Sequence, residues 1–291
     1  MIVAVASGKG GTGKTTVTAS LAAVWRRPLT AADLDVEAPN LHLFLRPKIE
    51  GRRQMSMLIP AVDESRCTYC RACSDICQFK AISVLGEVLL TFPEMCHGCG
   101  ACMAVCPEKA ITEDARLLGE IAWGQWKDVG FFDGRLRVGE AMSPPLIGHV
   151  KDAAMENARK RGADLLLDVP PGVSCPPMRA VSGADLIVLV TEPTPFGLYD
   201  LKLAVEAFSV FERPMGVVVN RAGIGGDEVY DYCRERSLPL FAEIPFTRKA
   251  AEAYSRGQIL ADALPEYRER FEDLAGELRR CGARSAGEVP A

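Results

Sequence analysis

Eight of the eleven cysteines fall into two runs with the same spacing, C-x2-C-x2-C-x3-C. The first run is Cys67, Cys70, Cys73 and Cys77, and the second, 29 residues later, is Cys96, Cys99, Cys102 and Cys106. In runs of this kind three thiolates bind three irons of one cube, while the fourth thiolate binds the other cluster. The sequence therefore predicts two [4Fe-4S] clusters. One would be held by Cys67, Cys70, Cys73 and Cys106, and the other by Cys96, Cys99, Cys102 and Cys77.

The similarity of the two runs extends beyond the cysteines, because residues 80–82 and 109–111 both read Lys-Ala-Ile. This internal duplication resembles the bacterial two-cluster ferredoxins over residues 60 to 115. Those ferredoxins usually have a proline after the fourth cysteine. Pro107 matches this pattern in the second run, but Gln78 replaces it in the first. The departure removes no ligand, although it bears on the potential and oxygen tolerance of the cluster that uses Cys77.

Two other uses of the cysteines are less favoured. Structural zinc also favours cysteine quartets, but zinc sites rarely use eight thiolates in two interlocked runs. A disulfide framework is not favoured, since a chain of 291 residues builds its core without such links and no signal peptide is recognised. We therefore expect a cytoplasmic protein whose cysteines stay reduced and free to bind metal.

A second candidate site lies within the first 25 residues of the sequence. An apolar run over residues 2–6 predicts a buried strand, and a helical pattern continues to about Trp25. Between them lies a glycine-rich loop formed by Gly8, Lys9, Gly10, Gly11, Thr12, Gly13, Lys14, Thr15 and Thr16. Glycines let backbone amides face phosphates, and the helix N-terminus attracts anions. In such a loop Lys14 neutralises the β and γ oxygens, and Thr15 binds Mg2+. The loop predicts a nucleoside triphosphate site.

The other lysine of the loop, Lys9, narrows the choice among families of nucleotide-binding proteins. The string G-K-G-G-x-G-K-[ST]-T resembles the deviant Walker A motif of the MinD/Mrp superfamily, a group of P-loop ATPases that includes MinD, ParA, Mrp and the nitrogenase iron protein. In that group the signature lysine reaches the phosphates of the partner subunit. For Lys9 the resemblance implies a homodimer that sandwiches the nucleotide, with charge stabilisation supplied in trans.

Acidic residues similar to those of this family follow in the right order. Asp33 and Asp35 resemble switch I, in which the second acid positions the attacking water or the Mg2+ shell. Asp35 is therefore expected to be catalytic and Asp33 to support it. The apolar run 165–167 ends at Asp168, as a Walker B strand does, and the resemblance implies that Asp168 holds Mg2+ through water.

Residues expected to contact the nucleotide base lie in a later part of the chain. An apolar run over residues 214–220 ends in Asn220 and Arg221, which resemble the pair that reads adenine in this group. Pro245 and Phe246 are expected to flank the same base. These residues favour ATP over GTP.

A ninth cysteine, Cys175, lies seven residues after Asp168. In the nitrogenase iron protein a switch II cysteine at this offset helps to hold a cluster between two subunits. The resemblance implies a third, bridging cluster as one use of Cys175. A buried structural thiol is the other. Two departures weaken the first use, because no second cysteine of that kind is visible, and neither is the later C-x-x-C of Mrp proteins.

Alternating strands and helices predict an α/β fold with a doubly wound, mostly parallel P-loop NTPase sheet and an inserted small α+β domain like a bacterial ferredoxin. The expected ATPase domain is split between residues 1–58 and 116–265. The expected ferredoxin domain, with two [4Fe-4S] clusters, spans 59–115, and a C-terminal helix and tail span 266–291. We expect the aromatic residues of 121–140 to be core residues rather than parts of extra strands.

Taken together, the resemblances imply an ATP-hydrolysing iron-sulfur protein that is a homodimer. It would couple a nucleotide-driven switch to electron transfer or to metal-cluster assembly on a redox or metallocofactor partner protein. The alternative is a spatial-organisation or scaffold ATPase of the MinD/ParA type, with structural or redox-sensing clusters. A net charge of −4 without a long basic run does not favour a nucleic-acid partner, and no apolar stretch is long enough for a membrane span.

Overall fold

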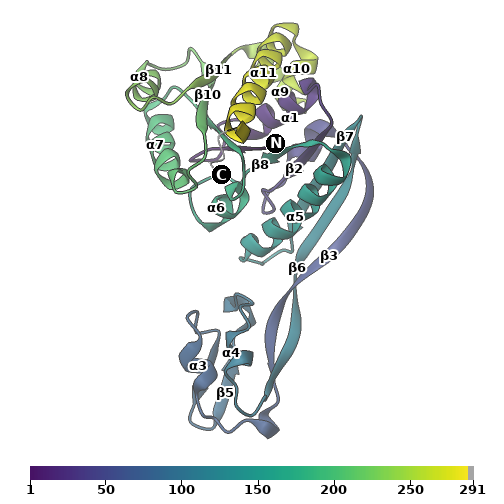
Figure 1. Cartoon of the computed structure of the whole chain (residues 1–291), viewed down its shortest axis with the longest axis vertical. Coiled ribbons are helices and arrows are strands. Elements are labelled where there is room, and N and C mark those ends of the chain that lie inside the picture. Colours follow the sequence, from purple (N-terminus) through teal and green to yellow (C-terminus); the bar gives the residue numbers. More distant parts are fainter. Residues whose placement is uncertain (288–291) are drawn as a thin grey trace.

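The computed structural model describes residues 1–287, with side chains described as far as residue 282. Its centre is a nine-stranded sheet with the strands β1 (Ile2–Ala6), β2 (Leu29–Asp33), β3 (Lys48–Val62), β6 (Ile111–Trp126), β7 (Val129–Leu136), β8 (Asp164–Asp168), β9 (Leu186–Thr191), β10 (Met215–Ala222) and β11 (Leu240–Pro245). Their order is β11-β10-β9-β1-β8-β2-β7-β6-β3 (Figure 1). Neighbouring strands are parallel from β11 to β7, and β6 is antiparallel to both of its neighbours.

Helices cover both faces of this sheet. They are α1 (Lys14–Val24), α2 (Leu41–Leu45), α5 (Ser143–Arg161), α6 (Cys175–Val181), α7 (Pro195–Ser209), α8 (Glu228–Glu235), α9 (Arg248–Ser255), α10 (Leu260–Ala263) and α11 (Pro265–Gly287). One apolar cluster packs α1, α2 and α9 to α11 on one face, and a second packs α5 to α8 on the other. The predicted α/β fold with a mostly parallel sheet is confirmed. None of the helices in the described residues is long and apolar enough to span a membrane.

Helix α11 is part of the main core. Its side chains Tyr267, Phe271 and Leu278 are fully buried and recur on one face of the helix, where they pack in the cluster around α1. The domain boundary expected after residue 265 would therefore separate α11 from the core that its apolar face completes. Residues 288–291 of the expected tail lie outside the described residues.

Strands β3 and β6 form a long antiparallel ribbon that leaves the edge of the sheet (Figure 1). Its pairing runs from Lys48 opposite Gln125 to Val62 opposite Ile111. The boundaries expected at 58/59 and 115/116 fall inside these two strands. The expectation that the aromatic residues of 121–140 are core residues is confirmed for Phe131 and Phe132, which are buried in the two apolar clusters. The expectation that they are not parts of strands is wrong, because most of this segment forms β6 and β7, which pair Trp123 with Phe132.

The far end of the ribbon carries a small unit over residues 63–110. Its elements are two single-turn helices (Glu64–Arg66 and Pro93–Met95), α3 (Ala72–Ile76), the hairpin of β4 (Ile82–Leu85) and β5 (Val88–Thr91), and α4 (Ala101–Ala104). The backbone repeats at the offset seen in the sequence. The Asp63 amide donates to the Ala110 carbonyl and the Phe92 amide to the Ala81 carbonyl, both at 2.8 Å. The internal duplication is thus also present in the backbone.

Candidate functional site

A cavity of about 270 Å3 opens at the carboxyl ends of the parallel strands. The sequence-predicted residues that line it are Gly10, Gly11, Gly13, Lys14, Thr15, Thr16, Asp35, Asp168, Asn220, Arg221, Pro245 and Phe246. Gly8, Lys9 and Thr12 belong to the same loop but do not line the cavity. This edge of a parallel sheet is where α/β proteins place their ligands, so the fold brings the predicted loop, acids and base-flanking residues to one cavity.

The glycine-rich loop joins β1 to α1. Gly13 caps the helix with φ of 96°, a left-handed conformation that favours glycine. A Cβ atom there would also lie 2.2 Å from the side-chain nitrogen of Asn220. Lys14 is buried, its Nζ donates to Ser7 Oγ at 2.8 Å, and burial lowers its pKa. The loop thus holds a lysine ammonium group at the start of a helix, as phosphate binding requires.

Asp168, at the end of β8, has the properties of a cation ligand. Its side chain is buried, Thr18 Oγ1 donates to its Oδ1 at 3.5 Å, and its Oδ2 has no partner among the described residues. Burial raises the pKa of Asp168 to about 6. A buried carboxylate oxygen without a partner is costly unless a cation or water satisfies it. With Thr15 and Asp35 lining the same cavity, these oxygen donors fit Mg2+.

The two switch I acids have different positions. Asp33 is fully buried, and its carboxylate accepts the backbone amides of Asp35 at 3.0 Å, Asn40 at 2.8 Å and Leu41 at 2.9 Å. Asp35 is only partly buried and lines the cavity. Burial raises the pKa of Asp35 and, more strongly, that of Asp33, which also feels the charge of Asp168. Asp33 therefore holds the backbone of the expected switch I, and Asp35 lines the cavity.

Asn220 and Arg221, the residues expected to read the base, make contacts that the sequence did not predict. Asn220 Nδ2 donates to the Thr12 carbonyl at 2.8 Å, which holds the loop against β10. Arg221 has φ of 55° and forms an ion pair with Glu192 at 2.8 Å. Both residues still line the cavity, as do Pro245 and Phe246, and Phe246 is exposed.

Lys9 does not line the cavity of its own chain. Its Nζ lies 3.9 Å from a carboxylate oxygen of Asp200 on α7 and 5.9 Å from the ring centroid of Phe196. The start of α7 carries two large exposed rings, since Phe196 is 78% and Tyr199 64% exposed. Gly8 allows this approach, because a Cβ atom there would overlap the Asp200 carbonyl.

The eight paired cysteines line two separate cavities in the small unit. The first is lined by Cys67, Cys70, Cys73 and Cys106, and the second by Cys77, Cys96, Cys99 and Cys102. The last cysteine of each run has crossed to the other site, which is the grouping expected from the spacing. In the described residues no group of three or more His, Cys, Asp or Glu is arranged for a single metal ion. Thiolates around a cube each bind a different iron, so they need not converge on one point.

Backbone amides point at several of these sulfurs. Ala81 N donates to Cys77 Sγ and Ala110 N to Cys106 Sγ, each at 3.3 Å. Burial by itself would raise the pKa of Cys77, but the amides of residues 79–82 outweigh it, so the pKa is lowered. Four thiols with amide donors in each of two cavities are a donor set that fits a [4Fe-4S] cluster.

Cys175 is the first residue of α6 and lines neither cysteine cavity. Its side chain is exposed. The alternative expectation of a buried structural thiol is therefore wrong.

Sequence reasoning missed several residues of the nucleotide site. Ser7 and Thr18 hold Lys14 and Asp168, and Asp200 and Glu192 pair with Lys9 and Arg221. A local signal existed for two of them: Ser7 directly precedes the glycine loop, and Thr18 lies one helical turn after Lys14. The two acids are distant in sequence from their partners, so no local pattern could have identified them.

The strand, glycine loop and helix, with a buried acid at the end of a neighbouring strand, define a P-loop nucleotide-binding protein. Comparison with family models identifies the family, since the CobQ/CobB/MinD/ParA nucleotide binding domain matches residues 3–260. The chain belongs to this family and is a P-loop ATPase of the MinD/ParA type.

Its relatives include two proteins of Methanocaldococcus jannaschii. The chain is 32% identical to the uncharacterized protein MJ0578 over 286 residues, which is 96% of each chain. It is 29% identical to the uncharacterized protein MJ0579 over 267 residues, covering 89% of this chain and 90% of the relative.

Solved structures with the same fold include two archaeal proteins. The cell division ATPase MinD of Pyrococcus furiosus has a TM-score of 0.59 at 23% identity, covering 96% of this chain and 98% of that one. The septum site-determining protein MinD of Pyrococcus horikoshii OT3, complexed with Mg-ADP, has a TM-score of 0.61 at 21% identity and covers 99% of both. At these identities the likeness concerns the fold alone.

Proposed function

We propose that this chain is an ATP-driven switch that carries two [4Fe-4S] clusters. It couples ATP binding and hydrolysis to electron transfer, or to metal-cluster assembly, on a redox or metallocofactor partner protein. The observation that carries the proposal is the sorting of eight cysteines into two cavities of four, with one cysteine of each run exchanged between them. When bound, such clusters supply one-electron chemistry at potentials set by charge, hydrogen bonds and exposure.

The chain's own residues would bind and activate MgATP. Lys14 and the loop amides would neutralise the phosphates, and Thr15 with Asp168 would hold Mg2+. Asp35 lines the cavity and is the candidate for orienting the attacking water. Pro245 and Phe246, which line the outer part of the cavity, would flank the adenine.

We further propose that the ATP-bound form is a homodimer. Lys9 is held at the surface by Asp200, and beside it Phe196 and Tyr199 are largely exposed. Aromatic residues are enriched at protein interfaces. In the dimer Lys9 would exchange Asp200 for the phosphates in the partner subunit. The exposed thiol of Cys175 is then a candidate ligand for a third cluster shared by two subunits.

A second function has support from the structural comparisons. The solved structures with this fold include MinD cell division proteins, a ParA family ATPase from Chlorobium tepidum TLS and McdA from Cyanothece. A spatial-organisation or scaffold ATPase would use the same nucleotide site, with clusters that are structural or redox-sensing. For both functions we propose a cytoplasmic protein that binds neither nucleic acid nor membrane.

Anaerobic analysis of the purified chain tests the proposal. Iron and sulfide would be quantified, EPR spectra recorded after reduction with dithionite, and ATP hydrolysis measured on the same sample. We expect about eight irons per chain and two interacting reduced clusters. Stoichiometric zinc without sulfide would overturn the iron-sulfur part.

The two functions differ in what the clusters do. For the electron-transfer function, reduced protein should pass electrons to an added acceptor at a rate that depends on MgATP. For the assembly function, a cluster should move to an apo-ferredoxin. Clusters that do neither, in an active ATPase, would favour the spatial-organisation function. Parallel spectra of Cys175→Ser would test the third cluster, since extra iron that depends on this thiol should be lost.

A further inference from the structure

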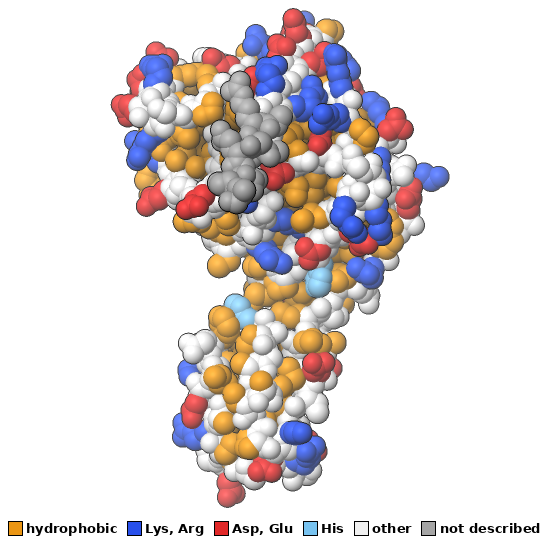
Figure 2. All heavy atoms as spheres, in the orientation of Figure 1, with side chains coloured by type: hydrophobic (Ala, Val, Ile, Leu, Met, Phe, Trp, Pro, Cys, Tyr) orange, Lys and Arg blue, Asp and Glu red, His pale blue; other side chains and the backbone are white. Residues whose placement is uncertain are grey.

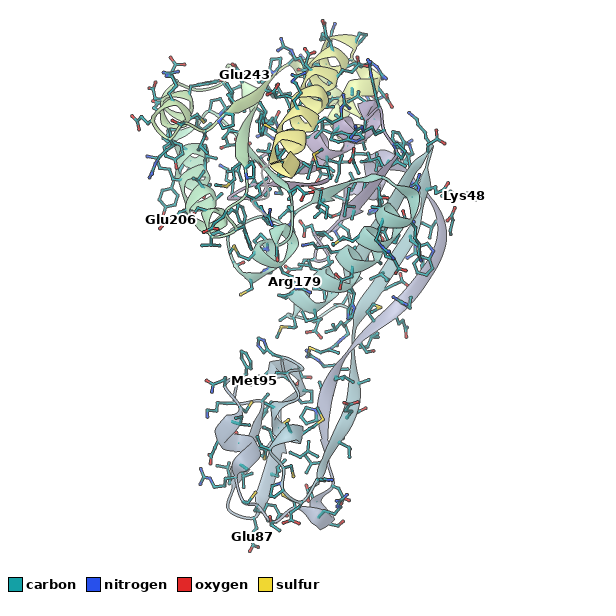
Figure 3. The ribbon with its side chains drawn as sticks, in the orientation of Figure 1. Lys48, Glu87, Met95, Arg179, Glu206 and Glu243 are labelled. Atoms are coloured by element: carbon teal, nitrogen blue, oxygen red, sulfur yellow. The ribbon has the colours of Figure 1, made fainter. Side chains whose placement is uncertain are left out.

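The small unit on the ribbon is connected to the nucleotide cavity through a series of side-chain contacts. In Figure 3, Met95 lies at the end of the unit nearer the ATPase domain, and Glu87 lies at the far end. Met95 immediately precedes Cys96, a residue of the second cysteine cavity. The second cavity also takes Leu58 and Pro60 of β3 into its lining, whereas the first takes none of that strand.

The loop of Cys96 packs directly on the ribbon. Met57, Ile59 and Leu118 form a buried apolar cluster there, and Cys96 and Met142 pack against it. Figure 2 shows hydrophobic side chains along this waist between the two lobes. The approach is close, because a Cβ atom on Gly98 would lie 2.8 Å from the Met57 side chain and 3.1 Å from the Leu58 carbonyl. Met142 thus joins the ATPase domain to the second cysteine site.

The segment 137–143, which follows β7 and ends with the first residue of α5, is fixed to the ribbon by charged side chains. Glu140 has a side chain that is 1% exposed and lies 3.3 Å from Arg116 of β6, which is itself 7% exposed. Glu140 also accepts the backbone amide of Met142 at 2.9 Å. Arg137 Nε donates to the Leu117 carbonyl at 2.7 Å. Separating the partners of a buried ion pair leaves an uncompensated buried charge, which costs much more free energy than breaking a surface pair. We therefore expect this segment and the ribbon to move together.

The other end of the same segment is bound to switch I. Ser143 is 2% exposed, and its hydroxyl donates to the Glu37 carboxylate at 2.9 Å. Glu37 lies two residues after Asp35, which lines the nucleotide cavity. Between them, Val36 is buried and its carbonyl accepts the Leu136 amide at 2.9 Å. Switch I, the 137–143 segment and the ribbon therefore form one continuous set of contacts.

We infer that the 137–143 segment transmits the nucleotide state of switch I to the second cysteine site, with Ser143 as the positioning residue. The inference rests on the proposed function, because it concerns the site to which we assign a cluster. It makes the two sites unequal: the second site, which contains Cys96, responds to nucleotide, and the first does not. A displacement of Glu37 would reach Met142 through Ser143, and Met142 contacts the cluster of side chains against which Cys96 packs.

The test is hydrogen–deuterium exchange on the full-length, cluster-loaded chain, with and without the nonhydrolysable analogue Mg-AMPPNP. In the wild type we expect amide exchange to change in residues 93–100 and 137–143, and to stay constant in the distal hairpin around Glu87. Loss of a hydrogen bond to a charged acceptor such as the Glu37 carboxylate corresponds to a factor of about ten or more in an equilibrium. Ser143→Ala should therefore reduce the response of 93–100 by about that factor.

Glu37→Gln is the matched control, because its amide oxygen can still accept from Ser143 and should retain the wild-type response. ATP hydrolysis and iron content are measured on each sample, so loss of the proposed function is recognised separately as absent activity or iron. Active, iron-loaded wild type with no nucleotide response at 93–100 would overturn the inference. An equal response in Ser143→Ala and wild type would also overturn it.

Discussion

Asp33 and Asp168 are direct neighbours across strands β2 and β8, and both carboxyl groups are buried at the edge of the sheet where the nucleotide cavity opens. Only Asp168 lines that cavity, whereas Asp33 is enclosed by backbone amides of switch I. When two buried carboxyl groups lie this close together, ionisation of one disfavours ionisation of the other. A bound cation would therefore be needed to keep Asp168 ionised without cost.

Magnesium binding should depend on pH through Asp168. Burial raises its pKa to about 6, so protons compete with the metal below that value. In the presence of ADP, we expect the affinity for Mg2+ to fall about tenfold between pH 7 and pH 5, because the carboxylate must lose its proton to bind the ion. Isothermal titration calorimetry with MgCl2 at the two pH values measures this. Asp168→Asn should bind weakly at both.

The stability of the metal-free chain should show the opposite pH dependence. Since the folded-state pKa of Asp168 is raised from 3.8 to about 6, the folded chain holds a proton that the unfolded chain releases. The contribution of this group is present below pH 3.8 and is lost as the pH rises through about 6. Chemical unfolding in EDTA at pH 5 and pH 7 would measure it, with Asp168→Asn expected to reduce the difference. An unchanged difference would assign it to other groups.

Asp33 should be essential to catalysis without contacting nucleotide. Its replacement by alanine leaves three backbone amides without an acceptor, and each unsatisfied buried group costs about 1–3 kcal/mol. Switch I would lose its shape, and we expect kcat for ATP hydrolysis to fall about 100-fold through misplacement of Asp35. Steady-state hydrolysis and ADP binding should be compared for Asp33→Ala and Asp33→Asn. A normal kcat in the alanine variant would disprove the positioning role.

Release of Lys9 should favour the proposed dimer. The ion pair with Asp200 is partly exposed and is therefore worth little, at most about 1 kcal/mol. Because each of the two subunits releases one such pair, Asp200→Asn should strengthen ATP-dependent dimerisation by no more than about thirtyfold, whereas Lys9→Ala should abolish it. Sedimentation velocity with and without ATP distinguishes the two variants. Equal dimerisation of Lys9→Ala and wild type would exclude a trans role for this lysine.

The exchanged cysteines allow a sharp test of the cluster assignment. Cys77→Ser should damage the same cluster as Cys99→Ser, although Cys77 belongs to the first run. Cys106→Ser should instead match Cys70→Ser. Each variant should retain about four irons, and the EPR spectrum of the remaining cluster should be the same within each pair. Spectra that pair Cys77 with Cys70 would show that each run binds its own cluster.

Removal of the large side chain of Phe271 should destabilise the whole ATPase domain. This residue of α11 is 1% exposed and packs in the cluster that surrounds α1. Phe271→Ala should cost about 3–5 kcal/mol of unfolding free energy through lost burial and the cavity left behind. Thermal unfolding followed by circular dichroism measures the effect, and the exposed Arg280→Ala serves as the control. A cost below about 1 kcal/mol would mean that α11 is not part of this core.

The sequence by itself predicted which residues gather at both candidate sites. The glycine loop, the acid after 165–167 and the two cysteine runs are local patterns, because their spacing is fixed by a single turn, strand or helix. The doubly wound sheet also followed from local periodicity, since apolar strands and helices alternate along the chain. Even the grouping of Cys77 with the second run could be expected, because in runs of this kind the fourth cysteine binds the other cluster.

Only the tertiary structure decided how these parts are joined. Strands β3 and β6 extend through the expected boundaries, because their pairing is between residues such as Lys48 and Gln125 that are distant in sequence. The contacts of Lys9 with Asp200, of Glu37 with Ser143 and of Arg116 with Glu140 have the same origin. Such pairs leave no periodic signal in a single sequence. They arise when the sheet assembles and brings the ends of its strands together. This assembly links the second cysteine site to Glu37 only indirectly, through the apolar cluster that Met142 contacts and through Ser143.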